Sequence, residues 1–164
     1  MAEPHAALGV VSAFVARLLL VALFLPFSAL DKILNFRGAV AQAREVVPSG
    51  ALAALLILAG LGVEIGMSLA VLTGIADRVA ALVLAAYCLV TALLWKQFWR
   101  PGDFWSGGPN GQARSLFWDF WKNLAVAGGF LMLTLGPSAR SAEAFLAAPL
   151  ASSHPYQATS VVQP

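Results

Sequence analysis

Two charged side chains interrupt long apolar segments, and they are the first candidates for chemistry in this chain. Arg17 lies in the segment of residues 8–30, and Glu64 lies in the segment of residues 49–73. An ionisable residue inside a membrane span is costly and needs a partner. At 1.5 Å of rise per residue, both lie roughly 10–14 Å below the same membrane surface. We therefore expect an Arg17–Glu64 ion pair, which either fixes the register of two helices or contacts a proton or a quinone headgroup.

A second polar group collects at the opposite ends of the apolar segments. In one interpretation its lysines simply extend to lipid headgroups. In the other, lysine and amide donors beside tryptophan rings form a pocket for a headgroup, because a quinone needs a flat apolar wall and a few placed donors. The candidate residues for this quinone or lipid site are Lys32, Trp95, Trp118, Lys122 and Asn123.

Tryptophan is confined to one part of the chain, between the end of the third apolar segment and the start of the fourth. Such residues form an aromatic belt at the headgroup level in many membrane proteins. A belt normally occupies both interfaces, so a cluster on one side also suits a wall against a partner subunit or a cleft for a flat ring. The five tryptophans are Trp95, Trp99, Trp105, Trp118 and Trp121.

The chain lacks the residues that several kinds of redox or metal site require. Cys88 is the single cysteine, so the chain cannot form an intrachain disulfide. His5 and His154 lie in opposite tails, and no His/Cys cluster has the spacing of a zinc or iron–sulfur site. We expect no metal and no covalent cofactor, so a redox role would need a quinone or a partner subunit from outside.

Composition places the chain in a membrane. Of 164 residues, 60% are hydrophobic and 11% are charged, whereas an ordinary soluble domain carries about 25% charged residues. The net charge of +2 is too small and too dispersed for a nucleic-acid binder. We expect a single integral membrane domain in contact with the lipid bilayer.

Four segments are long enough to cross a bilayer, which needs roughly 20 apolar helical residues. This predicts an all-α, four-helix membrane bundle over residues 1–136, followed by an extramembrane tail over residues 137–164. The tail is rich in Ala, Ser and Pro, and we expect it to be disordered or packed on a partner, with a short turn around Phe145. The predicted spans cover residues 8–30, 49–73, 79–95 and 119–135.

The connections indicate orientation and packing. Apolar residues recur at helical spacing over Phe36–Val47, which predicts an amphipathic helix at the membrane interface. The two longer loops carry six Lys or Arg against two on the other side, which favours cytoplasmic loops and both termini outside. Small residues that let helices approach closely are Gly62, Gly66, Ala125 and Gly129.

The motifs resemble those of the DoxX family. The opening has Arg17 and then Leu30-Asp31-Lys32, Glu64 lies among glycines, and the fourth span opens with Phe120-Trp121-Lys122-Asn123-Leu124 followed by Gly128-Gly129. The resemblance covers about residues 10–137. It implies a four-helix protein of the bacterial inner membrane, with a link to thiosulfate:quinone oxidoreductase. The positions that carry over are Arg17, Lys32, Glu64, Lys122 and Asn123.

These observations leave three functional hypotheses. The first is an accessory membrane subunit of a respiratory or other electron-transfer complex, docked through the aromatic loop and the tail. The alternative is a quinone-binding component of a membrane oxidoreductase. A small transporter built around Arg17 and Glu64 ranks third, because four spans without a repeat leave little room for alternating access. No residue is assigned a catalytic role.

Overall fold

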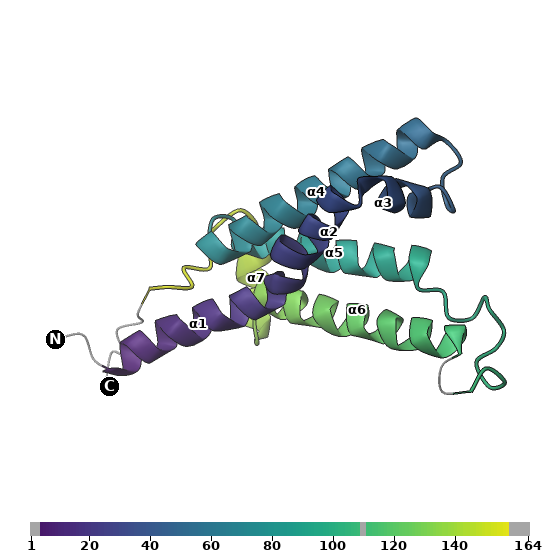
Figure 1. Ribbon diagram of the computed structural model, residues 1–164. Helices are drawn as coiled ribbons and strands as arrows, with labels where there is room; N and C mark the ends of the chain where they lie inside the picture. Colours follow the sequence, from purple (N-terminus) through teal and green to yellow (C-terminus); the bar gives the residue numbers. More distant parts are fainter. Residues whose placement is uncertain (1–3, 109–110, 158–164) are drawn as a thin grey trace.

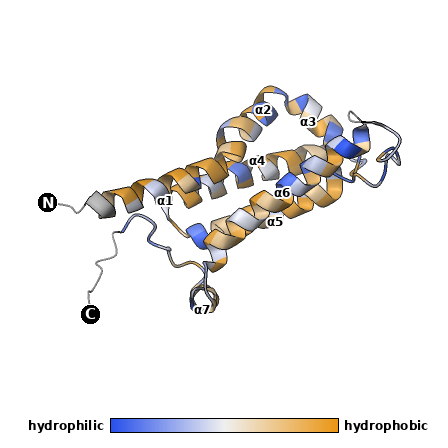
Figure 2. Ribbon diagram, turned by 90° about the horizontal axis from the view of Figure 1, so that it is seen from below, coloured by the Kyte–Doolittle hydropathy of each residue, from blue (hydrophilic) through white to orange (hydrophobic). Residues whose placement is uncertain are grey.

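The fold is all-helical, as predicted. The computed structural model describes residues 4–108 and 111–157, and every regular element in these ranges is a helix (Figure 1). The long helices are hydrophobic along most of their length, while hydrophilic residues gather towards the helix ends and connections (Figure 2). This distribution is the one expected for helices in contact with lipid.

The first helical segment is longer than its predicted span and changes geometry in the middle. It consists of α1 (Pro4–Ala22), the π-helix η1 (Leu23–Ser28) and α2 (Ala29–Leu34). Pro26 lies inside η1. A proline has no backbone N–H and clashes with the preceding turn, so the helix widens there and then resumes. The short helix α3 (Phe36–Ala43) follows directly.

The remaining long helices begin and end at recognisable signals. Ser49 caps the start of α4 (Gly50–Thr73), and Gly74 ends it with a left-handed φ of 78°. A short turn leads into α5 (Asp77–Trp95). Gly136, also with positive φ, ends α6 (Gln112–Leu135).

Three segments are long and apolar enough to cross a membrane. They are Ala6–Leu34, Gly50–Thr73 and Asp77–Trp95, which agrees with the first three predicted spans. The predicted fourth span, 119–135, lies within α6, which is not among the three. The first half of α6 contains Arg114, Asp119, Lys122 and Asn123, so its uninterrupted apolar run is short. The four-span arrangement therefore stays a prediction.

The core forms where α5 packs between α4 and α6 (Figure 1). α1 and η1 add to it from the side of α4. The largest apolar side chains that are fully buried there are Val21, Val71, Leu84 and Phe130. Small residues of α5, including Ala81 and Cys88, allow the helices to come close.

One of the residues predicted to let helices approach closely, Gly129, lies in a tight contact between helices. A Cβ at Gly129 would lie 2.8 Å from Leu20 Cδ2, so this glycine allows α6 to approach α1. Gly62, Gly66 and Ala125 are exposed. The GxxxG step of α4 therefore makes no close helix contact among the described residues, because the buried face of α4 is the opposite one.

The interfacial helix is shorter than predicted. α3 ends at Ala43 rather than at Val47, and a turn replaces its last residues. Ala43 is buried, while Arg37 and Arg44 are exposed, so the helix is amphipathic as expected. Its place at the membrane surface stays a prediction.

The tail is ordered as far as the structure describes it, which corrects the expectation of disorder. α7 (Ala139–Ala147) begins with a capping box formed by Ser138 and Ser141. Phe145 is buried, and the Arg78 guanidinium lies 5.2 Å from its ring centroid. The described residues after α7 then return to the bundle, so this part of the tail packs on its own chain.

Candidate functional site

A buried polar cluster surrounds Glu64 in the interior of the helices. The side chain is 1% exposed, and its Oε1 atom accepts three hydrogen bonds. Lys32 Nζ donates at 2.7 Å, Tyr87 Oη at 2.8 Å and Ser28 Oγ at 3.0 Å. The carboxylate is thus held by a cation and two hydroxyls from three different helical elements. This is the main candidate site.

The local structure explains how these groups reach Glu64. Ser28 ends η1, and Lys32 follows one turn later and donates to Ser28 Oγ at 2.6 Å. The π-helical segment therefore sets the rotation of both side chains. On the other side, a Cβ at Gly60 would lie 3.3 Å from the Tyr87 hydroxyl, so the glycine leaves room for this ring. Phe24 packs edge-on against Tyr87.

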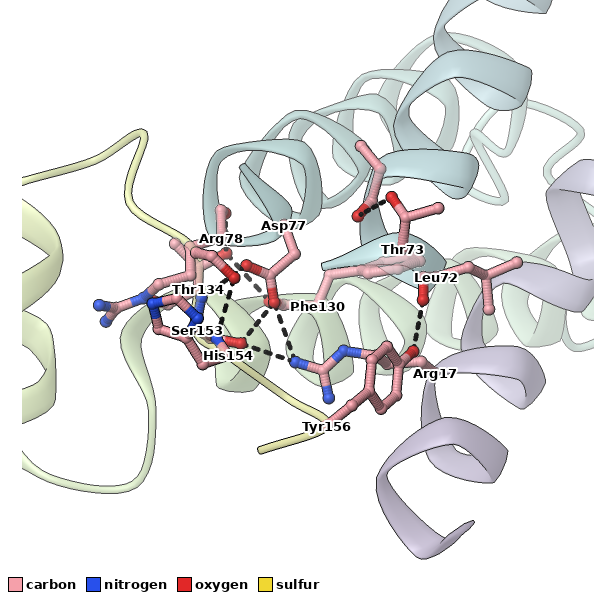
Figure 3. A network of polar contacts seen from close by, with 12 residues as sticks. Arg17, Leu72, Thr73, Asp77, Arg78, Phe130, Thr134, Ser153, His154 and Tyr156 are labelled. Carbon is pink, nitrogen blue, oxygen red and sulfur yellow. Dashed lines mark hydrogen bonds and ion pairs between the residues drawn. The ribbon is translucent and has the colours of Figure 1, made fainter. Parts of the chain in front are cut away.

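A second buried ion pair joins Arg17 and Asp77 at the end of the bundle where α4 turns into α5. Arg17 Nη2 lies 3.0 Å from Asp77 Oδ2, and both residues are buried (Figure 3). Asp77 lies in the first turn of α5, where the helix dipole favours a negative charge. The pair therefore ties α1 to the start of α5.

The tail completes this second cluster. Ser153 accepts a hydrogen bond from Arg17 Nη2 at 2.9 Å and donates to Asp77 from its backbone N–H, at 2.9 Å, and from its hydroxyl (Figure 3). The Tyr156 hydroxyl donates to the Leu72 carbonyl, and its ring lies 6.3 Å from that of Phe14. The residues around Ser153 thus act as a strap across the ion pair.

The predicted pairing of Arg17 with Glu64 is wrong. Each residue is buried as expected, but Arg17 pairs with Asp77 and Glu64 pairs with Lys32. The first helical segment extends to Leu34, so Lys32 lies beside Glu64 rather than at the end of a span. Arg17 pairs with Asp77, which follows Glu64 by 13 residues, or roughly 20 Å of helix. Arg17 and Glu64 therefore lie at different levels along the helices, and not at the equal depth that the sequence predicts.

The predicted headgroup site does not assemble around its five residues. Lys32 is bound by Glu64, whereas Asn123 Nδ2 donates to the Asp119 carbonyl and Lys122 lies 3.6 Å from the Asp119 carboxylate. Trp118 is exposed. The Trp95 Nε1 atom is buried and has no acceptor among the described residues.

The aromatic residues form one connected cluster beside this region. Phe98 contacts the rings of Trp99, Phe104, Phe117 and Phe120. Trp95 ends α5 and both Trp118 and Trp121 lie on α6, so the loop between the helices contains only Trp99 and Trp105. We call residues 96–111 the aromatic loop. The Asp103 carboxylate accepts from Gln112 N and Ala113 N at 3.0 Å each and so joins this loop to α6.

An open pocket lies in the aromatic cluster. Its volume is about 360 Å³ and its walls are almost entirely rings. Trp105 stands out from the surface with 90% of its area exposed. The lining residues are Phe98, Trp99, Gly102, Phe104, Trp105 and Phe117.

Sequence reasoning missed four residues of the two buried clusters, namely Ser28, Asp77, Tyr87 and Ser153. Asp77 begins α5, and an acidic residue in the first turn of a helix is a signal that the sequence does offer. Ser28 lies four residues before Lys32, which is also a detectable spacing. Tyr87 and Ser153 carried no local signal, because only packing brings them to their partners.

Comparison with known proteins identifies relatives over most of the chain. The DoxX family model matches residues 12–97, more than half of the chain. The chain is 31% identical over 130 residues to "Inner membrane protein YphA" of Escherichia coli (strain K12), which covers 77% of this chain and 84% of that protein. It is 33% identical over 137 residues to "Inner membrane protein YqjF" of the same organism, with coverages of 83% and 92%. No solved structure matches significantly.

The two ion pairs predict a specific pattern of mutational coupling. Lys32→Met and Glu64→Gln should each destabilise the protein by about 3–5 kcal/mol, because each leaves a buried group without its partner. The Lys32→Met/Glu64→Gln double variant should lose much less than the sum. Thermal unfolding in detergent micelles measures these values. Arg17→Met combined with Glu64→Gln is the matched control, since these sites share no contact and their effects should add. Coupling between Arg17 and Glu64 would contradict the structure.

The strap should contribute measurably to stability. Ser153→Ala removes one acceptor and one donor from the Arg17–Asp77 pair, so we expect a loss of about 1–3 kcal/mol, since both bonds involve charged groups. Gln157→Ala is the control, because Gln157 is exposed and makes its hydrogen bond through the backbone. Unfolding of both variants is followed by circular dichroism. Equal stability of Ser153→Ala and wild type would show that the strap does not hold the pair.

Proposed function

The chain belongs to the DoxX family and is a multi-pass protein of the bacterial inner membrane, and from this premise we propose that it is an accessory subunit of a respiratory or other electron-transfer complex. The aromatic loop is the surface that receives the partner subunit. The observation that carries this proposal is the exposure of Trp105, at 90%, beside Trp99, at 52%. Exposed aromatic side chains on a loop that is fixed by packing are among the residues that most often anchor protein interfaces.

The construction of the loop supports docking rather than simple contact with lipid headgroups. Trp105 packs edge-on against Phe104, and Phe104 in turn packs against Phe98 and Phe117. The exposed Trp105 ring is therefore supported from below by other rings. Asp103 ties the same loop to the start of α6. A rigid aromatic anchor loses little conformational entropy on binding.

The tail offers a second and smaller surface. The strap beyond α7 is occupied by contacts with its own chain, so it is not free to bind a partner. Leu146 and Leu150 are exposed at 73% and 74%, on and just after α7. Among the described residues of the tail, this outer side of α7 is the surface that we assign to docking.

Site-specific photo-crosslinking tests the accessory role. A benzophenone amino acid placed at Trp105 should give an adduct with a membrane subunit that carries a haem, flavin or iron–sulfur centre, identified by mass spectrometry and optical spectra from native membranes. The same probe at Leu19, which is 72% exposed in the last turn of α1, is the lipid-facing control. Equal adducts at both positions, or adducts only with proteins that lack a redox centre, would refute the proposal.

A second candidate function, quinone binding, is favoured by the aromatic pocket. Its volume of about 360 Å³ suits a single ring system, and its walls supply flat apolar faces. Trp99 and Trp105, which line the pocket, have indole rings that can stack on a quinone ring. In this candidate the electron donor is again a partner protein.

Quinone retention separates this candidate from the first. Phe104→Ala removes a wall of the pocket, so we expect the quinone extracted per mole of purified protein to fall by about tenfold, which corresponds to roughly 1.4 kcal/mol. Phe27→Ala, at a ring that is 69% exposed on η1, should leave retention unchanged. Chromatographic quantification of extracted quinone gives the measurement. Equal retention in both variants would remove the candidate.

A further inference from the structure

One oxygen of the buried Glu64 carboxylate has no hydrogen-bond partner among the described residues. Oε1 accepts from Lys32, Ser28 and Tyr87, whereas Oε2 is buried and has no partner among the described residues. A buried acceptor without a donor is costly, especially when it carries charge. The three donors around Glu64 all converge on Oε1, so Oε2 is left without a donor among the described residues.

A second unpaired polar atom lies one helical turn further along the same helix. Ser68 is fully buried, and its Oγ atom has no partner among the described residues. Helix hydroxyls usually bond to a carbonyl three or four residues earlier. Thr73, Thr91 and Thr134 all do so in this protein. Ser68 is therefore a hydroxyl that the helix itself does not use.

The two atoms share one face of α4, because residues four apart lie above one another on a helix. Together they present an anionic acceptor and a hydroxyl that can donate or accept. The groups that surround this face are Lys32 and Ser28 from the first helical segment and Tyr87 from α5, with Cys88 buried next to Tyr87. Such a site is complementary to a small guest that carries an O–H group.

We propose that the buried face of α4 at Glu64 and Ser68 binds a hydroxyl-bearing guest, which donates to Glu64 Oε2 and forms a hydrogen bond with Ser68 Oγ. Two further observations point to a functional site here. An ionisable group inside a membrane span is retained for function more often than for stability. The π-helical η1, which ends at Ser28, is a type of distortion that frequently marks functional sites.

The guest chemistry has two sources. A buried water molecule satisfies groups of this kind in many proteins. A hydroxyl of a hydroquinone ring offers the same donor, and this source rests on the quinone candidate above. Both satisfy Oε2 by the same hydrogen bond, so the experiment must distinguish them.

The sign of one stability change tests whether a guest is present. If the site is empty, Ser68→Ala removes an unpaired buried hydroxyl and should leave the protein equally or more stable. If a guest is bound, the same change removes its second contact, and we expect Tm to fall by about 2–4 °C in detergent micelles. The variant folds readily because alanine favours helix more than serine does. Ser12→Ala is the control, since Ser12 is exposed on α1.

Two further arms identify the source. For water, infrared difference spectra are recorded in H₂¹⁶O and H₂¹⁸O, and we expect a shifted O–H band that is lost in Ser68→Ala and Glu64→Gln but kept in Ser12→Ala. For the hydroquinone, 2,3-dimethoxy-5-methylhydroquinone is titrated by calorimetry, and we expect about tenfold weaker binding in Ser68→Ala. An isotope-sensitive band without binding assigns water, and binding that displaces the band assigns the hydroquinone.

The proposal is overturned if Ser68→Ala leaves Tm unchanged or raises it while the infrared band and the titration match wild type. Phe104→Ala separates this result from the proposed function. That variant alters the aromatic pocket but leaves Glu64 and Ser68 intact, so the Ser68 readouts should be unaffected by it. Failure at α4 therefore does not count against the aromatic loop. Failure of quinone binding at the loop removes the hydroquinone as a source but leaves the water molecule as a guest at α4.

Discussion

The Lys32–Glu64 ion pair is the interaction on which the arrangement of the helices depends. A carboxylate that is 1% exposed among apolar helices must be compensated, because an unpaired buried charge costs several kcal/mol. The compensation comes from Lys32 and Ser28 on one side and Tyr87 on the other. Satisfying Glu64 therefore fixes the first helical segment, α4 and α5 relative to one another, and the π-helical geometry of η1 is part of that solution.

The Arg17–Asp77 pair performs the corresponding role at the end of the bundle. It joins α1 to the first turn of α5, about 20 Å of helix away from the Lys32–Glu64 pair. Between the two pairs the core is apolar, with Val21, Val71 and Leu84 fully buried. The strap at Ser153 then covers the outer pair. Two polar clusters separated by an apolar layer specify the helix register more strictly than apolar packing alone could do.

The aromatic loop is held in place by ring packing rather than by buried ion pairs. Ring contacts run from Phe98 through Phe117 to Trp121, and Asp103 ties the loop to α6. Ring contacts hold this part of the protein together, while its outermost ring, Trp105, is exposed. A rigid exposed aromatic surface suits recognition of a partner, whereas the buried carboxylate of α4 suits a small guest. The two candidate sites are thus distinct in place and in chemistry.

The sequence by itself determined the class of the protein, the positions of three membrane spans and the family, because hydrophobic run length and helix-ending glycines act locally. It also identified Arg17 and Glu64 as charges inside the apolar segments. Their partners were decided only by the tertiary structure. Pairing depends on the register of helices distant in the chain, and that register follows from a first segment that extends to Leu34 and changes geometry at η1. Tyr87 and Ser153 became site residues for the same reason, since packing and not sequence spacing brings them to Glu64 and Asp77.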